Sequence, residues 1–149
     1  MSLQQRISEE LKQAMLAKDV EKLSTLRLLK SAIGYAQIEK KTDALADPDI
    51  IAVIQKEAKK RRDSIEQYRT AGRTDLADKE ASELVVLETF LPKPLSAEEL
   101  DALVRATIQE LGASTRKDMG PVVKAVQAKA AGRADGKAIS SVVSKLLPP

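Results

Sequence analysis

Apolar residues recur every three or four positions along nearly the whole of this 149-residue chain. The spacing is clear from the first segment onward, in Leu3, Ile7, Leu11 and Met15. Side chains at this spacing share one face of an α-helix. No segment shows the alternation of apolar and polar residues that is typical of a strand. The sequence therefore predicts an all-α protein whose amphipathic helices pack on one another.

The N-terminal part is predicted to hold four helices that form a bundle. Asp47 followed by Pro48 is typical of an N-cap and the first helical position. Gly72 fits the end of that helix, and Thr74 can cap the next one. The helix before Asp47 has apolar surface on more than one side, because it carries two stripes: Leu23, Leu26, Ile33 and Ala36 on one, and Leu28, Ala32 and Tyr35 on the other.

The segment LPKPLSAEEL, residues 91–100, is the clearest boundary in the chain. Pro92 and Pro94 each disfavour helix at the residue before them. Ser96 and Glu99 then match the S-x-x-E capping box that starts a helix. A new helix is therefore expected to begin directly after this proline-containing segment.

The boundary predicts two domains joined by a short linker. We expect an N-terminal helical domain over residues 1–92, a linker over residues 92–95, and a small three-helix C-terminal domain over residues 95–149. Each half carries enough regularly spaced apolar residues to build a core of its own.

Cysteine and histidine are both absent from the sequence. Their absence excludes Cys nucleophiles, His bases and the usual zinc ligand sets, so we expect no metal and no cofactor. No run approaches the ~20 apolar residues that a membrane span needs. The N-terminal segment is amphipathic, carries acids and lacks the apolar core of a signal peptide. The expectation is a cytoplasmic protein without a membrane partner.

Basic residues gather in the C-terminal third. Residues 114–149 hold seven basic and two acidic side chains, a net charge of +5, whereas the whole chain has a net charge of +3. Residues 1–113 therefore have a net charge of −2. A basic surface of this kind fits an acidic partner such as nucleic acid, although a solvated helical surface would look the same in the sequence.

The segment GRADGK, residues 132–137, contains two glycines and a lysine, as a phosphate-binding loop does. A P-loop, however, needs G-x-x-x-x-G-K-[ST] after a strand. Here Gly132 and Gly136 are too close, Lys137 is followed by alanine, and no strand precedes. The sequence predicts instead a turn between two helices, with Gly132 just beyond the first and Asp135 as the N-cap of the second.

Arg133 and Lys137 flank the predicted helix N-terminus, where backbone N–H groups already favour phosphate. Basic side chains add contacts that release counterions from a nucleic acid. We therefore predict a nucleic-acid contact at this turn, with supporting phosphate contacts from Lys117, Lys124 and Lys129.

Aromatic side chains are too few for extensive base stacking. The chain has only Tyr35, Tyr68 and Phe90, and both tyrosines lie on helix faces that are predicted as core. RNA would then be recognised through its phosphates and shape.

A second basic cluster, KEAKKRRDS, occupies residues 56–64. Arg61 lies on the apolar stripe of its helix, so we expect it to be partly buried. A buried arginine needs a carboxylate partner, which Glu83 or Glu88 of the following helix could supply. The other basic residues are expected on a solvated face with i,i+4 partners, namely Lys59 with Asp63 and Arg62 with Glu66.

Five blocks resemble the GatB/YqeY family and together extend over essentially the whole chain. They are LSTLRLLKSAI (23–33), KEAKKRRDSIEQYRTAGRTDL (56–76), LETFLPKPLSAEEL (87–100), GASTRKDMGPVVKAV (112–126) and GRADGKAISSVVSKLL (132–147). Free-standing members of that family are small and all-helical. The C-terminal part is similar to the tail domain of the B subunit of the glutamine-dependent aspartyl/glutamyl-tRNA amidotransferase, which helps to hold the tRNA.

The resemblance implies a tRNA-related function, and the family label is carbon–nitrogen ligase with glutamine as amido-N donor. The chain matches neither the serine–lysine glutaminase machinery of that enzyme nor its magnesium and nucleotide site, so we predict no catalytic residue in the isolated chain. Three hypotheses stay open: a module that binds tRNA, an adaptor that docks amidotransferase subunits or an aminoacyl-tRNA synthetase without touching RNA, and a ligase.

Overall fold

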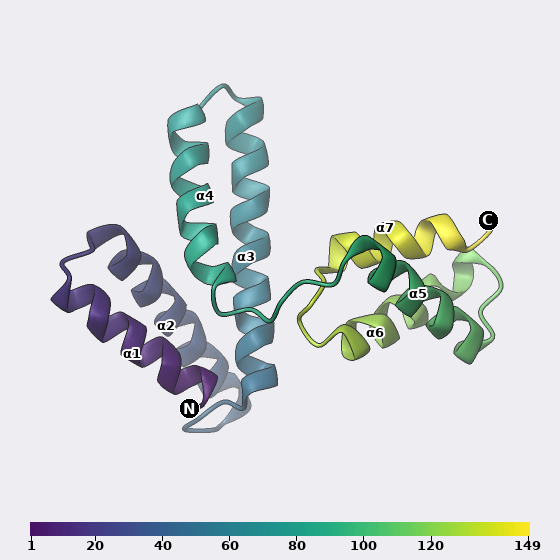
Figure 1. The fold of residues 1–149 in the computed structure, drawn as a ribbon, viewed down its shortest axis with the longest axis horizontal. Coiled ribbons are helices and arrows are strands. Elements are labelled where there is room, and N and C mark those ends of the chain that lie inside the picture. Colours follow the sequence, from purple (N-terminus) through teal and green to yellow (C-terminus); the bar gives the residue numbers. More distant parts are fainter. The chain divides into compact units, whose positions relative to one another are not determined.

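A computed structural model describes residues 1–149 and contains helices and turns but no strand, which confirms the all-α prediction. The first four helices are α1 (Leu3–Leu16), α2 (Val20–Lys40), α3 (Asp47–Thr70) and α4 (Thr74–Glu88). They are followed by α5 (Ala97–Leu111), the short 3₁₀ helix η1 (Arg116–Asp118), α6 (Met119–Ala130) and α7 (Gly136–Leu146). Figure 1 shows the order of these elements along the chain. None of the helices combines the length and apolar character that crossing a bilayer would take.

The chain divides into two compact units, Met1–Leu91 and Pro92–Pro149. Each has its own cluster of buried apolar side chains. The division falls at the proline-containing segment that the sequence singles out. Independent folding of each unit as a domain stays a prediction, which a fragment experiment can test.

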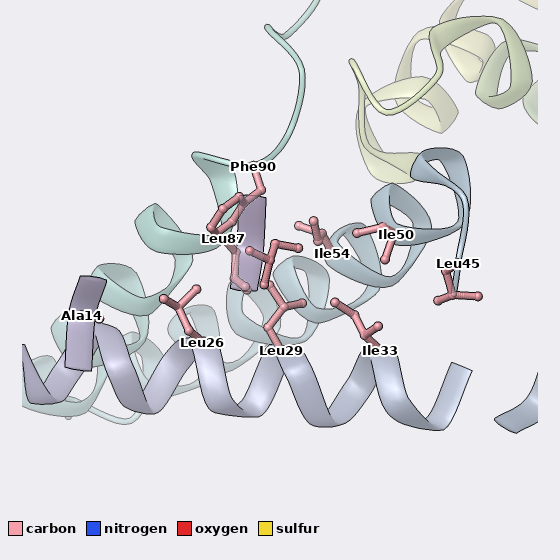
Figure 2. Close-up of a cluster of buried hydrophobic side chains, with 10 residues drawn as sticks. Ala14, Leu26, Leu29, Ile33, Leu45, Ile50, Ile54, Leu87 and Phe90 are labelled. Carbon is pink, nitrogen blue, oxygen red and sulfur yellow. The ribbon is translucent and has the colours of Figure 1, made fainter. Parts of the chain in front are cut away.

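The core of the N-terminal unit lies where α1, α2, the first turns of α3 and the end of α4 meet. Figure 2 shows Leu26, Leu29 and Ile33 of α2 directed toward Ile50 and Ile54 of α3. The remaining turns of α3 and α4 pair with each other as a helical hairpin (Figure 1). Few apolar side chains are buried in this part of the hairpin: the small Ala58 and Ala77, and the larger Ile65.

Arg61 lies inside this hairpin, with only 12% of its side chain exposed. Its guanidinium is paired with the carboxylates of Glu83 and Glu80, the second at 3.0 Å. The prediction of a buried arginine with Glu83 as partner is confirmed, whereas the alternative partner Glu88 is exposed. The predicted pair between Lys59 and Asp63 is also present, at 3.6 Å.

A predicted helix start is confirmed where the capping residues are close together in the sequence. Ser96 and Glu99 form the predicted capping box of α5. Asp47, in contrast, is the first residue of α3 rather than its N-cap, which is Ala46. The reason is tertiary, since the Asp47 carboxylate accepts a hydrogen bond of 3.0 Å from the backbone N–H of Leu3 and so ties α1 to α3. The predicted cap Thr74 is likewise already helical, one residue beyond the N-cap of α4.

The second apolar stripe of α2 stays on the surface. Leu28 is 54% exposed and Tyr35 is 75% exposed, because the core takes the side of α2 that carries Leu26, Leu29 and Ile33. The expectation that Tyr35 lies in the core is therefore wrong. The buried aromatic side chain is Phe90, which follows α4.

The C-terminal unit packs α5, α6 and α7 around a core of branched side chains that includes Val104, Val126 and Ile139. The segment GRADGK forms the turn between α6 and α7. Gly132 lies beyond the end of α6 with a φ of 87°, which favours glycine. The Asp135 side chain caps α7 by accepting a hydrogen bond of 2.7 Å from the Ala138 N–H. The predicted helix-to-helix turn is confirmed.

Candidate nucleic-acid interface

Positive charge is unevenly divided between the two units. Residues 1–91 carry sixteen basic and sixteen acidic side chains, whereas residues 92–149 carry nine basic and six acidic ones, a net charge of +3. Within the C-terminal unit, four of the six acids belong to α5. The chain from η1 onward therefore holds most of the excess positive charge.

The two acids in this basic part are both used as caps. Asp118 accepts hydrogen bonds of 2.9 Å and 3.3 Å from the backbone N–H groups of Ser114 and Thr115. These bonds favour the ionised form and hold the pKa of Asp118 below its ordinary value. Asp135 caps α7, as described above. Its carboxylate occupies the N-terminus of α7, which is where the sequence suggests that backbone N–H groups would receive a phosphate.

Arg133 is held by contacts within the C-terminal unit. Its Nε donates a hydrogen bond of 2.9 Å to the carbonyl oxygen of Lys93. The guanidinium also lies 3.6 Å from the Glu99 carboxylate, which α5 supplies. The backbone carbonyl of Arg133 accepts a further bond, of 2.8 Å, from the N–H of Leu95. Arg133 thus fastens the start of the unit to the α6–α7 turn, with 40% of its side chain exposed.

Lys129 is paired as well. Its ammonium contacts the carboxylate of Glu110, near the end of α5. The same ammonium lies 3.4 Å from the hydroxyl oxygen of the buried Thr107. Lys129 therefore joins α6 to α5, and its ammonium already has the Glu110 carboxylate as an ionic partner.

Lys117, Lys124 and Lys137 are exposed and form no ion pair. Lys117 lies in η1, which runs directly into α6, and Lys124 follows it by seven residues. A separation of seven residues corresponds to about two helical turns, so both side chains lie on nearly the same side of α6.

The same side of α6 also reaches the first turn of α7. Gln127 follows Lys124 by three residues and shares its face. A Cβ built at Gly136 would lie 3.2 Å from the Gln127 side-chain nitrogen, so this face approaches the start of α7. Lys137 is the next residue of that helix. We call the three unpaired lysines, Lys117, Lys124 and Lys137, the lysine strip.

All five residues that the sequence proposes as contacts belong to the C-terminal unit. Three form the lysine strip, and the other two are engaged with groups far away in the sequence. Arg133 reaches Lys93, forty residues earlier, and Lys129 reaches Glu110, nineteen residues earlier. No local pattern in the sequence could have revealed these partners.

Comparison with known proteins gives one family and several relatives. The model of the family described as Yqey-like protein matches residues 4–147. An uncharacterised protein of Schizosaccharomyces pombe is 39% identical over 95 residues, which are 64% of this chain and 76% of that protein. The altered inheritance of mitochondria protein 41 of Vanderwaltozyma polyspora is 36% identical over 70% of this chain and 58% of its own length. Its counterpart in Pyrenophora tritici-repentis is 30% identical over 95% of this chain and 79% of its own length.

The expectation of a cytoplasmic protein is wrong in the light of these relatives. Those whose names state a location are mitochondrial proteins. The expectation relied on the lack of an apolar signal segment. Mitochondrial transit peptides are amphipathic and rich in arginine and serine, so that lack does not distinguish the two compartments.

The family match extends over both units and over the lysine strip. It agrees with the resemblance carried by the five sequence blocks, which are distributed over the same range. The chain belongs to the YqeY-like protein family.

Proposed function

We propose that the C-terminal unit binds tRNA through its phosphates, with the lysine strip as the main contact. The observation that carries this proposal is that Lys117, Lys124 and Lys137 are exposed and unpaired within the most basic part of the chain. An unpaired lysine gains a full ionic contact when it meets a phosphate and releases the counterion of that phosphate. Arg133 and Lys129 would first have to leave Glu99 and Glu110, so their role is secondary.

The choice of tRNA among polyanions rests on the family resemblance. The C-terminal part is similar to the amidotransferase tail domain, which helps to hold tRNA in that enzyme. The surface suits a structured RNA, because double-stranded RNA is recognised through its shape, its phosphates and its 2′-hydroxyls. Stacking contributes little, since neither tyrosine belongs to the C-terminal unit.

Neutralising the lysine strip tests the proposal. In the variant Lys117→Gln/Lys124→Gln/Lys137→Gln, binding of a tRNA transcript should weaken, and the slope of log affinity against log salt should fall by about 2 to 2.7 units, at roughly 0.7 to 0.9 per lost contact. Folding should be nearly unchanged, because exposed and unpaired side chains usually contribute less than about 0.5 kcal/mol. Fluorescence anisotropy over a series of salt concentrations measures the slope.

The N-terminal unit offers a matched control. Lys12, Lys30 and Lys79 are likewise exposed and without an ion pair, so changing them to glutamine removes the same net charge. This control should keep the wild-type slope. Equal losses in both variants would mean that only net charge matters, and an unchanged slope in the strip variant would remove the lysine strip from the proposal.

A further inference from the structure

A groove lies between α2 and α3 in the N-terminal unit, with a volume of about 610 Å³. Leu28, Ala32 and Tyr35 of α2 line it as an apolar row, which we call the floor, and Val53 and Lys56 line its wall from α3. The groove therefore has an apolar floor bounded by two helices. It is lined only by residues of the N-terminal unit, whereas the lysine strip belongs to the C-terminal unit.

The apolar floor is not used by the fold. The core takes Leu26, Leu29 and Ile33 from the opposite side of α2. Leu28 and Tyr35 remain 54% and 75% exposed although they stand at helical spacing, two turns apart. A helix with a second apolar face that its own fold leaves uncovered is typical of a binding surface.

One unpaired lysine of the groove can receive an acidic side chain of a partner. Two of the acids that line it are already neutralised, because Asp49 is paired with Lys40 at 2.6 Å and Glu57 with Lys60 at 3.3 Å. Lys56 has no acidic partner and lies in the α3 wall, in the turn after Val53. An incoming carboxylate would meet an uncompensated positive charge beside an apolar floor.

The remaining acid, Glu39, lines the opposite end of the groove, next to the end of α2. The groove is thus positive toward Lys56 and negative toward Glu39, which sets a direction for any charged occupant. The two rows of groups, apolar along the floor and charged along α3, match the two faces of an amphipathic helix.

We propose that this groove binds an amphipathic helix of a partner protein. The apolar face of that helix packs on Leu28, Ala32 and Tyr35, and an acidic side chain next to this face pairs with Lys56. RNA fits the groove poorly, because the unpaired carboxylate of Glu39 lines it and would repel phosphates. The N-terminal unit as a whole also carries no net charge that would attract a polyanion.

Synthetic helical peptides of about 18 residues, long enough to form helix in water, test this proposal. The first has leucines at i, i+3, i+4 and i+7 spacing with glutamates beside them, and the second has lysines in place of the glutamates. Each is titrated into the isotopically labelled full chain. The glutamate peptide should shift the NMR signals of residues 28–36 and 52–57, and the lysine peptide should bind at least about tenfold more weakly.

Single substitutions separate the two parts of the groove. Tyr35→Ser should weaken binding of the glutamate peptide about tenfold, as expected for an exposed aromatic anchor. Lys56→Gln should weaken it about two- to fivefold, the range of an exposed ion pair. Val85→Ser is the matched control, because Val85 is 63% exposed but lies on α4, outside the groove. That control should bind the peptide as the wild-type chain does.

An affinity weaker than about 1 mM for the glutamate peptide, or equal affinity for the two peptides, would overturn the proposal. Loss of peptide binding in the Val85→Ser control would also overturn it. The same holds if the signals of residues 28–36 shift when the chain self-associates or when tRNA is added in place of the peptide. The proposed function does not depend on the outcome, since it concerns the other unit.

Discussion

Arg61 keeps its charge inside the α3–α4 hairpin because α4 supplies two carboxylates to the same guanidinium. The sequence predicts this burial because Arg61 falls on the apolar stripe of a long helix. It also offers Glu83 or Glu88 of the next helix as the partner, and the structure selects Glu83. One group is left over, as the Arg61 Nε is buried without a hydrogen-bond partner. The paired nitrogen of the guanidinium depends on Glu80 and Glu83 of α4 for its partners.

Removing the arginine should be costly. Arg61→Met leaves Glu83 buried without a counter-charge, and breaking a buried pair in this way usually costs about 3 to 5 kcal/mol. The free energy of unfolding from urea denaturation measures the effect. Adding Glu80→Gln and Glu83→Leu should restore most of the loss, because a buried ion cluster can often be replaced by apolar side chains. A cost below about 1 kcal/mol for the single change would show that the cluster does not hold the hairpin together.

The contacts of Arg133 could not be predicted from the sequence alone. Its basic charge and its place beside a helix start are visible in the sequence, and both suggest a phosphate contact. Its partners are the carbonyl oxygen of Lys93 and the carboxylate of Glu99, which only the packed unit brings close. The sequence identified the basic region, but the structure separates its paired members from its unpaired ones.

At some helix starts the capping partners are close in the sequence, and at others the contact comes from a distant part of the chain. The box at Ser96 and Glu99 was predictable because both partners lie within four residues of each other. The start of α3 was misplaced by one residue because the Asp47 carboxylate binds α1 instead of its own helix. A similar local box joins Thr115 to Asp118 at η1 and encloses Lys117, the first residue of the lysine strip.

The η1 box should make the C-terminal unit sensitive to acid. The pKa of Asp118 is held below its ordinary value by backbone N–H donors, so its stabilising contribution is present above the unfolded pKa of about 4. This contribution is lost as pH falls through the lower, folded pKa, because the unfolded chain takes up the proton first. The difference in unfolding free energy between wild type and Asp118→Asn should be largest near neutral pH and should shrink below about pH 4.

Denaturation of both proteins over a pH series measures this difference. Other carboxylates, among them Glu99 with its lowered pKa, act on both proteins alike and cancel in the comparison. A difference that stays constant down to about pH 2 would show that Asp118 does not contribute through its charge.

Two units with separate cores make up the molecule. The prolines and the capping box predicted a boundary because both are local signals. The contacts add that residues 93–95 belong with the C-terminal unit, since Lys93 and Leu95 bond to Arg133. The extent of the linker was therefore less predictable than its existence. Exposure of the second apolar face of α2 could not be predicted either, because the spacing of apolar residues does not say which face of the helix packs on the core.

A fragment of residues 92–149 should fold by itself. It contains the whole second core and both bonds to Arg133, so its circular dichroism should be helical and its thermal melt cooperative. A fragment of residues 95–149 lacks Lys93 and should melt at a lower temperature. An unfolded 92–149 fragment at low temperature, beside a stable full chain, would contradict the two-domain prediction.

We propose that the lysine strip, rather than the rest of the chain, contacts the RNA. NMR mapping of the full chain with an unlabelled tRNA transcript tests it most directly, because every backbone amide reports at once and no substitution is needed. Shifts and broadening should gather at residues 117–127 and 136–138, should fade as salt is added, and should spare α3. Changes centred on the basic segment 56–62 of α3, with the C-terminal unit unaffected, would contradict it.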